Sequence, residues 1–180
     1  MKPAAMQIIE MQKRFVQFKN EYFFESIIFS YQWWFLLIIA VGLWFVWAIV
    51  VDKKRLNAIL LVGLMASIIA LILDEIGLFL TLWAYAYQLA PFTQKLLTVD
   101  IAIIPVSYML LYQYARKWRP YLIRLFLLSL FAVFVAEPIF GMLGIYILLG
   151  WEHWYSTPFY FLIGVFVKWM ADKAVGDKGF

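Results

Sequence analysis

Five ionisable side chains lie within or beside long apolar stretches of this 180-residue sequence: Asp74, Glu75, Asp100, Glu137 and His153. An ionised side chain is costly to place in an apolar environment, so such residues usually face a protein interior and mark a functional site. A carboxyl that burial keeps neutral can act as a general acid. Acids at several depths can instead relay protons or bind a cation. We therefore identify these five residues as candidate catalytic residues.

Aromatic side chains are abundant around the acids and make up 21% of the sequence. The face of an aromatic ring attracts a cation, so these rings could stabilise a positively charged intermediate. We expect substrate contacts from Trp83, Tyr85, Tyr108, Trp151 and Tyr155. The alternative for most of them is an aromatic belt at a membrane surface.

Several other chemistries are excluded by the residue types. The sequence has no cysteine, which removes disulfides and thiolate ligands or nucleophiles. A single histidine and the lack of a glycine-rich phosphate loop give no sign of a metal site or a cofactor. The net charge of +4 comes from short basic clusters at the ends of apolar runs, so we expect no nucleic-acid partner.

The composition indicates an all-α integral membrane helix bundle. Hydrophobic residues make up 66% of the chain and charged residues 14%, with a mean hydropathy of +0.86. A membrane-spanning helix needs about 20 apolar residues. The apolar runs predict about five such helices in a single domain over residues 27–173, near 27–51, 56–85, 94–115, 121–149 and 157–170.

Residues 1–26 alternate apolar and charged positions. Apolar residues spaced three and four apart place Ile8, Met11 and Phe15 on one helical face. We expect an amphipathic helix that lies in the membrane interface. A helix that packs on the loops of the bundle is the alternative.

Basic residues predict the orientation in the cytoplasmic membrane. They gather at one set of helix ends, at Lys53, Lys54, Arg55, Arg116, Lys117, Arg119, Lys168, Lys173 and Lys178. The positive-inside rule places those ends, and the tail 174–180, in the cytoplasm and the N-terminal helix outside. Arg124 and Lys168 would then extend their charged ends to the interface.

Helical phase predicts that the acids share one pocket in the outer half of the membrane. Asp74, Gly77 and Tyr85 fall on one stripe, which makes this stripe the inner face, with Glu75 about 100° away. Pro138 removes a backbone donor and predicts a kink beside Glu137. The apolar inner halves of the helices predict a pocket that is closed toward the cytoplasm. The alternative is that buried, hydrogen-bonded carboxyls only lock the bundle.

Several strings resemble a family of small multi-pass membrane proteins of spore-forming Firmicutes, over residues 74 to 169. They are Asp74-Glu75-Ile76-Gly77, Leu82-Trp83-Ala84-Tyr85, Asp100 with Ile104-Pro105, Tyr112-Gln113-Tyr114, Glu137-Pro138, Trp151-Glu152-His153-Trp154-Tyr155-Ser156 with Pro158, and Lys168-Trp169. This resemblance implies a fold and a bacterial host.

A second, local resemblance is to integral-membrane lycopene cyclases and related terpene cyclases. It consists of Asp74, followed by Trp83 and Tyr85. The sequence lacks the Pro-x-Glu-Glu element of those enzymes, for which Asp100 and Pro105 are a loose substitute. The resemblance implies acids that protonate an isoprenoid alkene and rings that stabilise the carbocation.

Three functions remain open from the sequence. The first is an enzyme that uses carboxylic general acids on an isoprenoid or lipid substrate, as an isoprenoid cyclase or a related lyase or isomerase. The second is a proton- or cation-linked transporter or channel. The third is a non-enzymatic envelope protein. The predicted blind pocket favours the enzyme.

Overall fold

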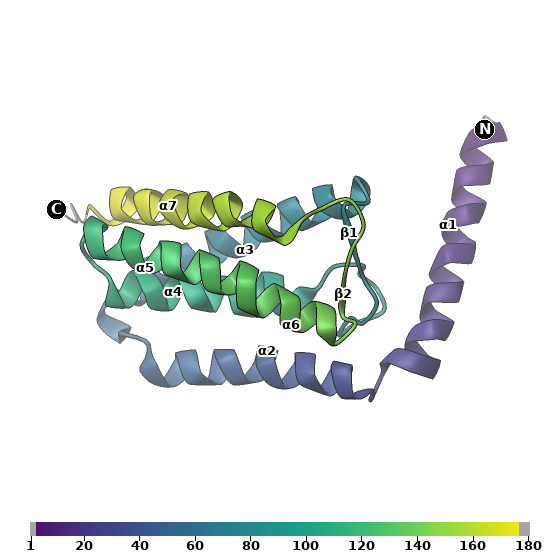
Figure 1. The fold of residues 1–180 in the computed structure, drawn as a ribbon, viewed down its shortest axis with the longest axis horizontal. Coiled ribbons are helices and arrows are strands. Elements are labelled where there is room, and N and C mark those ends of the chain that lie inside the picture. The colour runs from purple at the N-terminus through teal and green to yellow at the C-terminus, as the bar shows by residue number, and fades with distance from the viewer. Residues whose placement is uncertain (1–2, 177–180) are drawn as a thin grey trace.

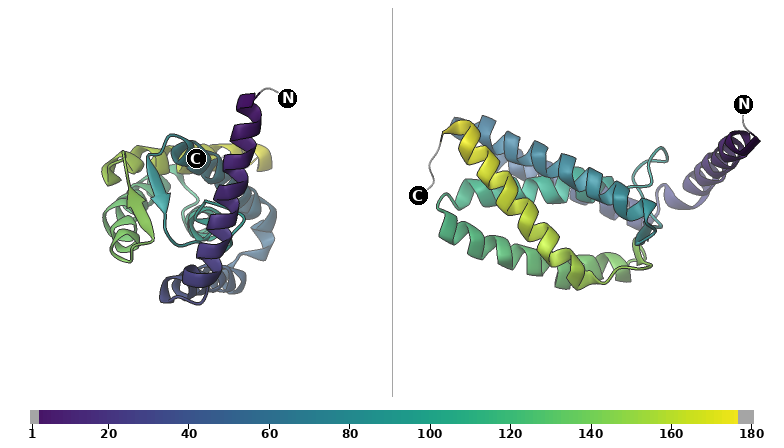
Figure 2. Two further views of the ribbon diagram at one scale, coloured as in Figure 1. Left: turned by 90° about the vertical axis from the view of Figure 1, so that its right-hand side faces the viewer. Right: turned by 90° about the horizontal axis from the view of Figure 1, so that it is seen from above.

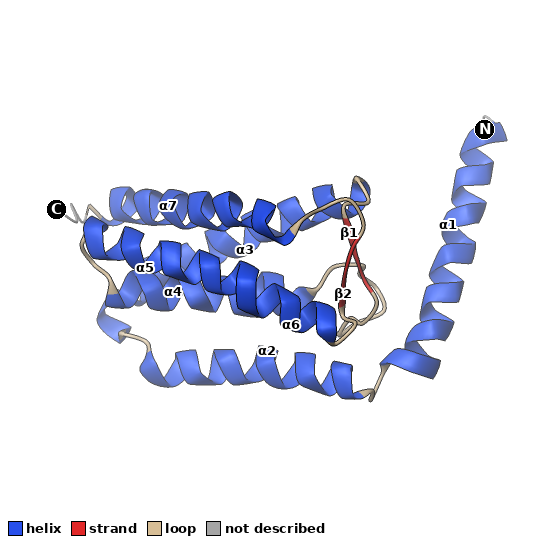
Figure 3. Cartoon of the chain, in the orientation of Figure 1, coloured by secondary structure: helices blue, strands red, loops and turns tan. Residues whose placement is uncertain are grey.

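The computed structural model describes residues 3–176, and these residues form helices and one short two-stranded ribbon (Figures 1 and 3). The helices are α1 (Pro3–Tyr22), α2 (Tyr31–Val50), α3 (Leu56–Phe79), α4 (Ile104–Tyr114), α5 (Trp118–Phe131), α6 (Glu137–Met142) and α7 (Ser156–Val175). The strands are β1 (Trp83–Tyr85) and β2 (Tyr146–Leu148). The all-α prediction is confirmed. Lys178, most of the predicted C-terminal tail and the first two residues of the predicted N-terminal segment lie outside the described residues.

Among residues 3–176, three helices are long and apolar enough to cross a membrane. They cover Tyr31–Val50, Lys53–Phe79 and Trp118–Met142, the last running from α5 into α6. The apolar helix Val99–Tyr114 is shorter. The fifth predicted span corresponds to α7, which has 20 residues but carries Lys168, Asp172 and Lys173 in its second half.

The helices α3, α4, α5 and α7 pack against one another as a bundle. Helix α2 runs along the outside of this bundle, against α4 and the segment that precedes it. Helix α1 projects across one end of the molecule, away from the bundle (Figures 1 and 2), and none of its described residues is buried. Two buried side chains at its base, Phe23 and Ile27, join it to the rest of the chain.

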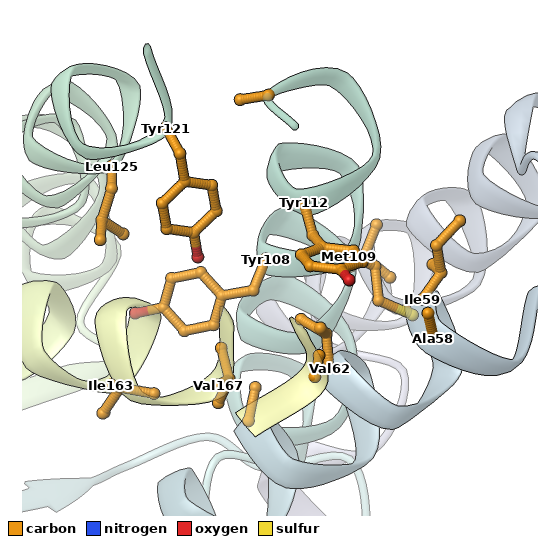
Figure 4. Close-up of a cluster of buried hydrophobic side chains, with 14 residues drawn as sticks. Ala58, Ile59, Val62, Tyr108, Met109, Tyr112, Tyr121, Leu125, Ile163 and Val167 are labelled. Atoms are coloured by element: carbon orange, nitrogen blue, oxygen red, sulfur yellow. The ribbon is translucent and has the colours of Figure 1, made fainter. Parts of the chain in front are cut away.

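A buried cluster fills the bundle at the end that holds the C-terminus. Tyr108, Tyr121 and Val167 meet there from α4, α5 and α7 (Figure 4). The hydroxyls of Tyr108 and Tyr121 both donate hydrogen bonds to backbone carbonyls of α7. Tyr108 donates to the Tyr160 carbonyl and Tyr121 to the Gly164 carbonyl, each at 2.7 Å. Apolar packing and paired hydroxyls therefore close this end of the bundle.

The opposite end carries the ribbon β1–β2, which the sequence did not predict. The pairs Trp83 with Leu148 and Tyr85 with Tyr146 define an antiparallel register. Helix α3 was expected to reach residue 85, but it ends at Phe79, and Thr81 follows with a φ of 53°. Because a positive φ ends a right-handed helix, the chain turns there and crosses the end of the bundle. The chain also turns after α6, where Gly144 has a φ of 70°, and crosses the same end of the bundle.

Candidate active site

A cavity of about 390 Å³ lies between the ribbon and the buried cluster. Helices α3, α5, α6 and α7, both strands and the segment around α4 contribute to its wall. Most of the lining side chains are aliphatic or aromatic. Seven of the ten residues predicted for the site line it: Asp74, Trp83, Tyr85, Asp100, Tyr108, Glu137 and Trp151. The structure therefore brings together acids from three helical segments that are far apart in the sequence.

Asp74 is held by two aromatic donors from β1. Its Oδ1 accepts a hydrogen bond from Trp83 Nε1 at 2.8 Å and another from the Tyr85 hydroxyl at 2.7 Å. The prediction that Tyr85 lies on the same helical stripe as Asp74 was wrong, because α3 ends at Phe79; Tyr85 reaches Asp74 from the strand β1 instead. Burial, with the charge of Asp74, raises the pKa of Tyr85 well above its ordinary value, so this phenol stays protonated and donates.

Asp100 lies near Asp74 on the wall of the same cavity. It belongs to a π-helical segment, Val99–Ile103, that leads into α4. A π-helical turn shifts the helix face by one residue, and such turns are frequent at functional sites. Within residues 3–176, the Oδ2 atoms of Asp74 and Asp100 are buried and have no hydrogen-bond partner. Two neighbouring carboxyls in an apolar cavity repel each other when both are ionised, so this arrangement favours a proton on one of them.

Glu137 forms a second polar cluster on the wall of the same cavity. Its Oε2 lies 2.8 Å from His153 Nδ1, and its Oε1 accepts from the Tyr160 hydroxyl at 2.9 Å. Ser156, which receives the indole N–H of Trp151 at 3.0 Å, is also within hydrogen-bond reach of Glu137. A π-helical segment, Ala132–Ala136, lies directly before Glu137; the sequence predicted a kink from Pro138 here and not a π-helical segment. Both acid clusters therefore stand next to a π-helical turn.

Tyr146 lies between the two clusters. Its ring stacks on Tyr85, with the centroids 5.7 Å apart, and lies 6.1 Å from the ring of His153. Burial is the main cause that raises the pKa of Tyr146 above its ordinary value, with the acids Glu137 and Asp74 adding to it. The ribbon thus places a neutral aromatic surface between the two acids.

Three of the predicted site residues do not line the cavity. The Glu75 side chain is 68% exposed and forms an ion pair with Lys95 at 2.9 Å. Tyr155 contacts other aromatic residues near the surface, with its ring 4.3 Å from Trp154. His153 does not line the cavity but contacts Glu137, which does. The position of Glu75 follows from its place in the helix, since consecutive side chains point about 100° apart.

Sequence reasoning missed Tyr146, Ser156 and Tyr160. A signal existed for two of them, because Ser156 and Tyr160 are four residues apart and therefore share a helical face. Tyr146 gave no signal, since it follows a glycine turn and sits in a strand of three residues.

Lys168 lies at the other end of the bundle, and the prediction that it extends to a membrane interface was wrong. Its side chain is 1% exposed and pairs with Asp172 at 3.0 Å, and its ammonium donates to the Arg116 carbonyl at 2.9 Å. Three rings surround the charge at 5.0–5.1 Å, those of Tyr112, Trp118 and Tyr121. The long side chain of Lys168 points into the bundle because the Asp172 carboxylate, the Arg116 carbonyl and the three rings take the place of the water that would surround its ammonium group.

The cavity can hold an apolar molecule against aromatic rings and offer it a proton from either side. Its volume falls within the range of about 300–1,000 Å³ that ligand pockets occupy. Within residues 3–176, no group of three or more His, Asp and Glu side chains is arranged to hold a metal ion. The carboxyls and phenols on the cavity wall can take part in acid–base chemistry.

Comparisons with known proteins give no match: no family model fits the chain, and no curated protein or solved structure is similar to it.

Proposed function

We propose that this chain is a multi-pass membrane enzyme that binds an isoprenoid-like lipid and isomerises or cyclises it by acid catalysis. In this proposal it crosses the cytoplasmic membrane about five times. The C-terminus is cytoplasmic, α1 lies in the outer interface and the cavity is in the outer half of the bilayer. Three helices of sufficient length and apolar character support the membrane location.

The observation that carries the proposal is a cavity with two separate acid clusters and an apolar, aromatic wall. Asp74 with Asp100 forms one cluster and Glu137 with His153 the other. A purely structural role would need one satisfied hydrogen bond for each acid. Instead, two carboxyls lie near each other, and the Oδ2 atom of each is buried without a hydrogen-bond partner among the described residues. This arrangement suits a group that gives up a proton.

In the proposed reaction, Asp100 donates its proton to a carbon–carbon double bond of the substrate. Asp74 is the ionised partner of the pair throughout, and Trp83 and Tyr85 stabilise its charge by their hydrogen bonds, while Asp100 becomes a carboxylate when its proton leaves. The new carbocation lies against the aromatic rings. Loss of a proton from a neighbouring carbon to the Glu137 carboxylate restores a double bond. The substrate gains one proton and loses one, and a proton then returns from Glu137 to Asp100, directly or through water, to restore the starting state before the next turnover.

The shape of the site favours binding over conduction. The buried cluster around Tyr108, Tyr121 and Val167 closes the bundle beyond the cavity. A transport path would need polar groups that continue through this region. The proposal therefore expects no proton or cation flux through the protein in liposomes, and such flux would favour a transporter.

The proposed function is tested by turnover of polyprenyl substrates with the purified protein in liposomes. Wild type is compared with Asp74→Asn, Asp100→Asn and Glu137→Gln, and products are analysed by mass spectrometry. Each variant should lose activity by about 10²–10⁴-fold, the usual contribution of a positioned acid or base. Glu152→Gln is the control, because this acid is exposed and lies next to His153 without lining the cavity.

Conversion that continues unchanged in both Asp74→Asn and Glu137→Gln would contradict the proposal. So would the absence of any conversion across polyprenyl chain lengths that the cavity can hold.

A further inference from the structure

Glu137 and His153 form a contact that leads from the inside of the cavity to its outside. Glu137 lines the cavity, and its side chain is 11% exposed. His153 does not line the cavity, and 32% of its side chain is exposed. Only 2.8 Å separate Glu137 Oε2 from His153 Nδ1. We propose that His153 is a proton port, through which Glu137 exchanges its proton with water outside the cavity.

The other groups that face Glu137 are themselves part of the cavity wall. Tyr160 and Ser156 reach it from α7 and Tyr146 lies nearby on β2, and all three line the cavity. The Ser156 hydroxyl is already engaged by the Trp151 indole. Of the described groups in contact with Glu137, only His153 stands outside the lining.

Imidazole chemistry fits this position, because its two nitrogens can accept a proton on one side and release one on the other. In the outward step the Glu137 O–H bond breaks, a proton joins Nδ1, and Nε2 gives its own proton to water. In the inward step water protonates Nε2, and the Nδ1 proton returns to the Glu137 carboxylate. Each step moves one proton in and one out of the ring, so the port needs no other reactant.

The other acid pair has no comparable contact with the surface among the described residues. Asp74 receives its hydrogen bonds from Trp83 and Tyr85, and both of these side chains line the cavity. Lys95, the nearby cation, is engaged by Glu75 and by the Leu71 carbonyl at 3.0 Å. The exchange of protons with water is therefore assigned to Glu137 and His153.

This role rests on the proposed function in one respect, since the port would discharge the proton that Glu137 removes from the substrate. Its test needs no substrate. Infrared spectroscopy follows the carboxyl carbonyl band of Glu137 after the protein is moved from H₂O into D₂O, and Glu137→Gln identifies the band. The rate at which this band shifts measures proton exchange at Glu137.

We expect His153→Ala to slow the exchange on the order of a hundredfold, within the range that a positioned acid–base group contributes. Added imidazole should restore the rate in His153→Ala, because the small molecule fills the space of the missing ring. His153→Gln should be slow and should not respond to imidazole, because the amide occupies that space but does not accept or release a proton near neutral pH. Tyr160→Phe, which removes the hydrogen bond on the other oxygen, should exchange at nearly the wild-type rate.

A wild-type rate of proton exchange at Glu137 in His153→Ala would overturn the port. A slow rate in His153→Ala that added imidazole does not restore would overturn it too. The absence of any band that Glu137→Gln removes, at every pH where the protein stays folded, would overturn it as well. None of these results depends on turnover, so a failure of the port is distinguishable from a failure of the proposed enzymatic function.

Discussion

The Trp83 ring occupies the space where a side chain of Gly77 would be. A Cβ atom on Gly77 would overlap the six-membered part of the Trp83 indole. The same indole donates its N–H to Asp74, three residues earlier in α3. One glycine in α3 therefore allows the ribbon to hold the first acid of the cavity.

Replacing Gly77 with alanine should displace Trp83 and destabilise the protein. Overpacking of this kind costs about 1–3 kcal/mol. The thermal midpoint in detergent should fall, and activity should fall with it because Asp74 loses a donor. Gly42→Ala is the matched control, since Gly42 also lies in a helix and a Cβ atom added there would meet nothing within 4 Å. A Gly42→Ala midpoint that falls as far as that of Gly77→Ala would contradict this explanation.

The hydrogen bond from Tyr85 to Asp74 should be measurable by a double-mutant cycle. Tyr85→Phe removes the hydroxyl and keeps the ring, and a hydrogen bond to a charged group contributes about 1.5–3 kcal/mol. The free energy of unfolding should fall less for Tyr85→Phe in an Asp74→Asn background than in wild type. Equal losses in the two backgrounds would show that the residues are not coupled.

Asp74 and Glu75 should behave differently although they are neighbours. Asp74 lines the cavity, whereas Glu75 points outward to Lys95. Glu75→Gln should therefore keep most of the polyprenyl-converting activity that Asp74→Asn loses. The Glu75 side of this ion pair is exposed, and surface ion pairs contribute only about 0–1 kcal/mol, so stability should change little as well. Equal loss of activity in both variants would place Glu75 in the reaction after all.

Lys168 should be essential for stability. Lys168→Met leaves the carboxylate of Asp172 partly buried without its cation, and breaking a buried pair costs about 3–5 kcal/mol. The double variant Lys168→Met/Asp172→Leu should recover much of this loss, because it removes both charges. Lys173→Met is the control, since Lys173 is exposed in the same helix. Denaturant unfolding of the four proteins measures these differences, and a double variant less stable than Lys168→Met would contradict the pairing.

Hydrophobic patterns predicted the helices and much of the site. Apolar runs marked the long helices, and the phase of α3 placed Asp74 on the inner face. The ribbon could not be predicted in this way, because strands of three residues show no periodicity and the turn at Thr81 follows from a backbone angle. The inward position of Lys168 depends on rings from two other helices, and the sequence does not show that these meet.

The central claim is that the acids of the cavity protonate a double bond of an isoprenoid substrate. Turnover of a polyprenyl substrate in D₂O tests it most directly, with the product analysed by mass spectrometry and NMR. We predict a product that carries one deuterium at the protonated carbon, and the loss of this product in Asp100→Asn. A product without deuterium, or deuterium incorporation that Asp100→Asn leaves unchanged, would contradict the claim.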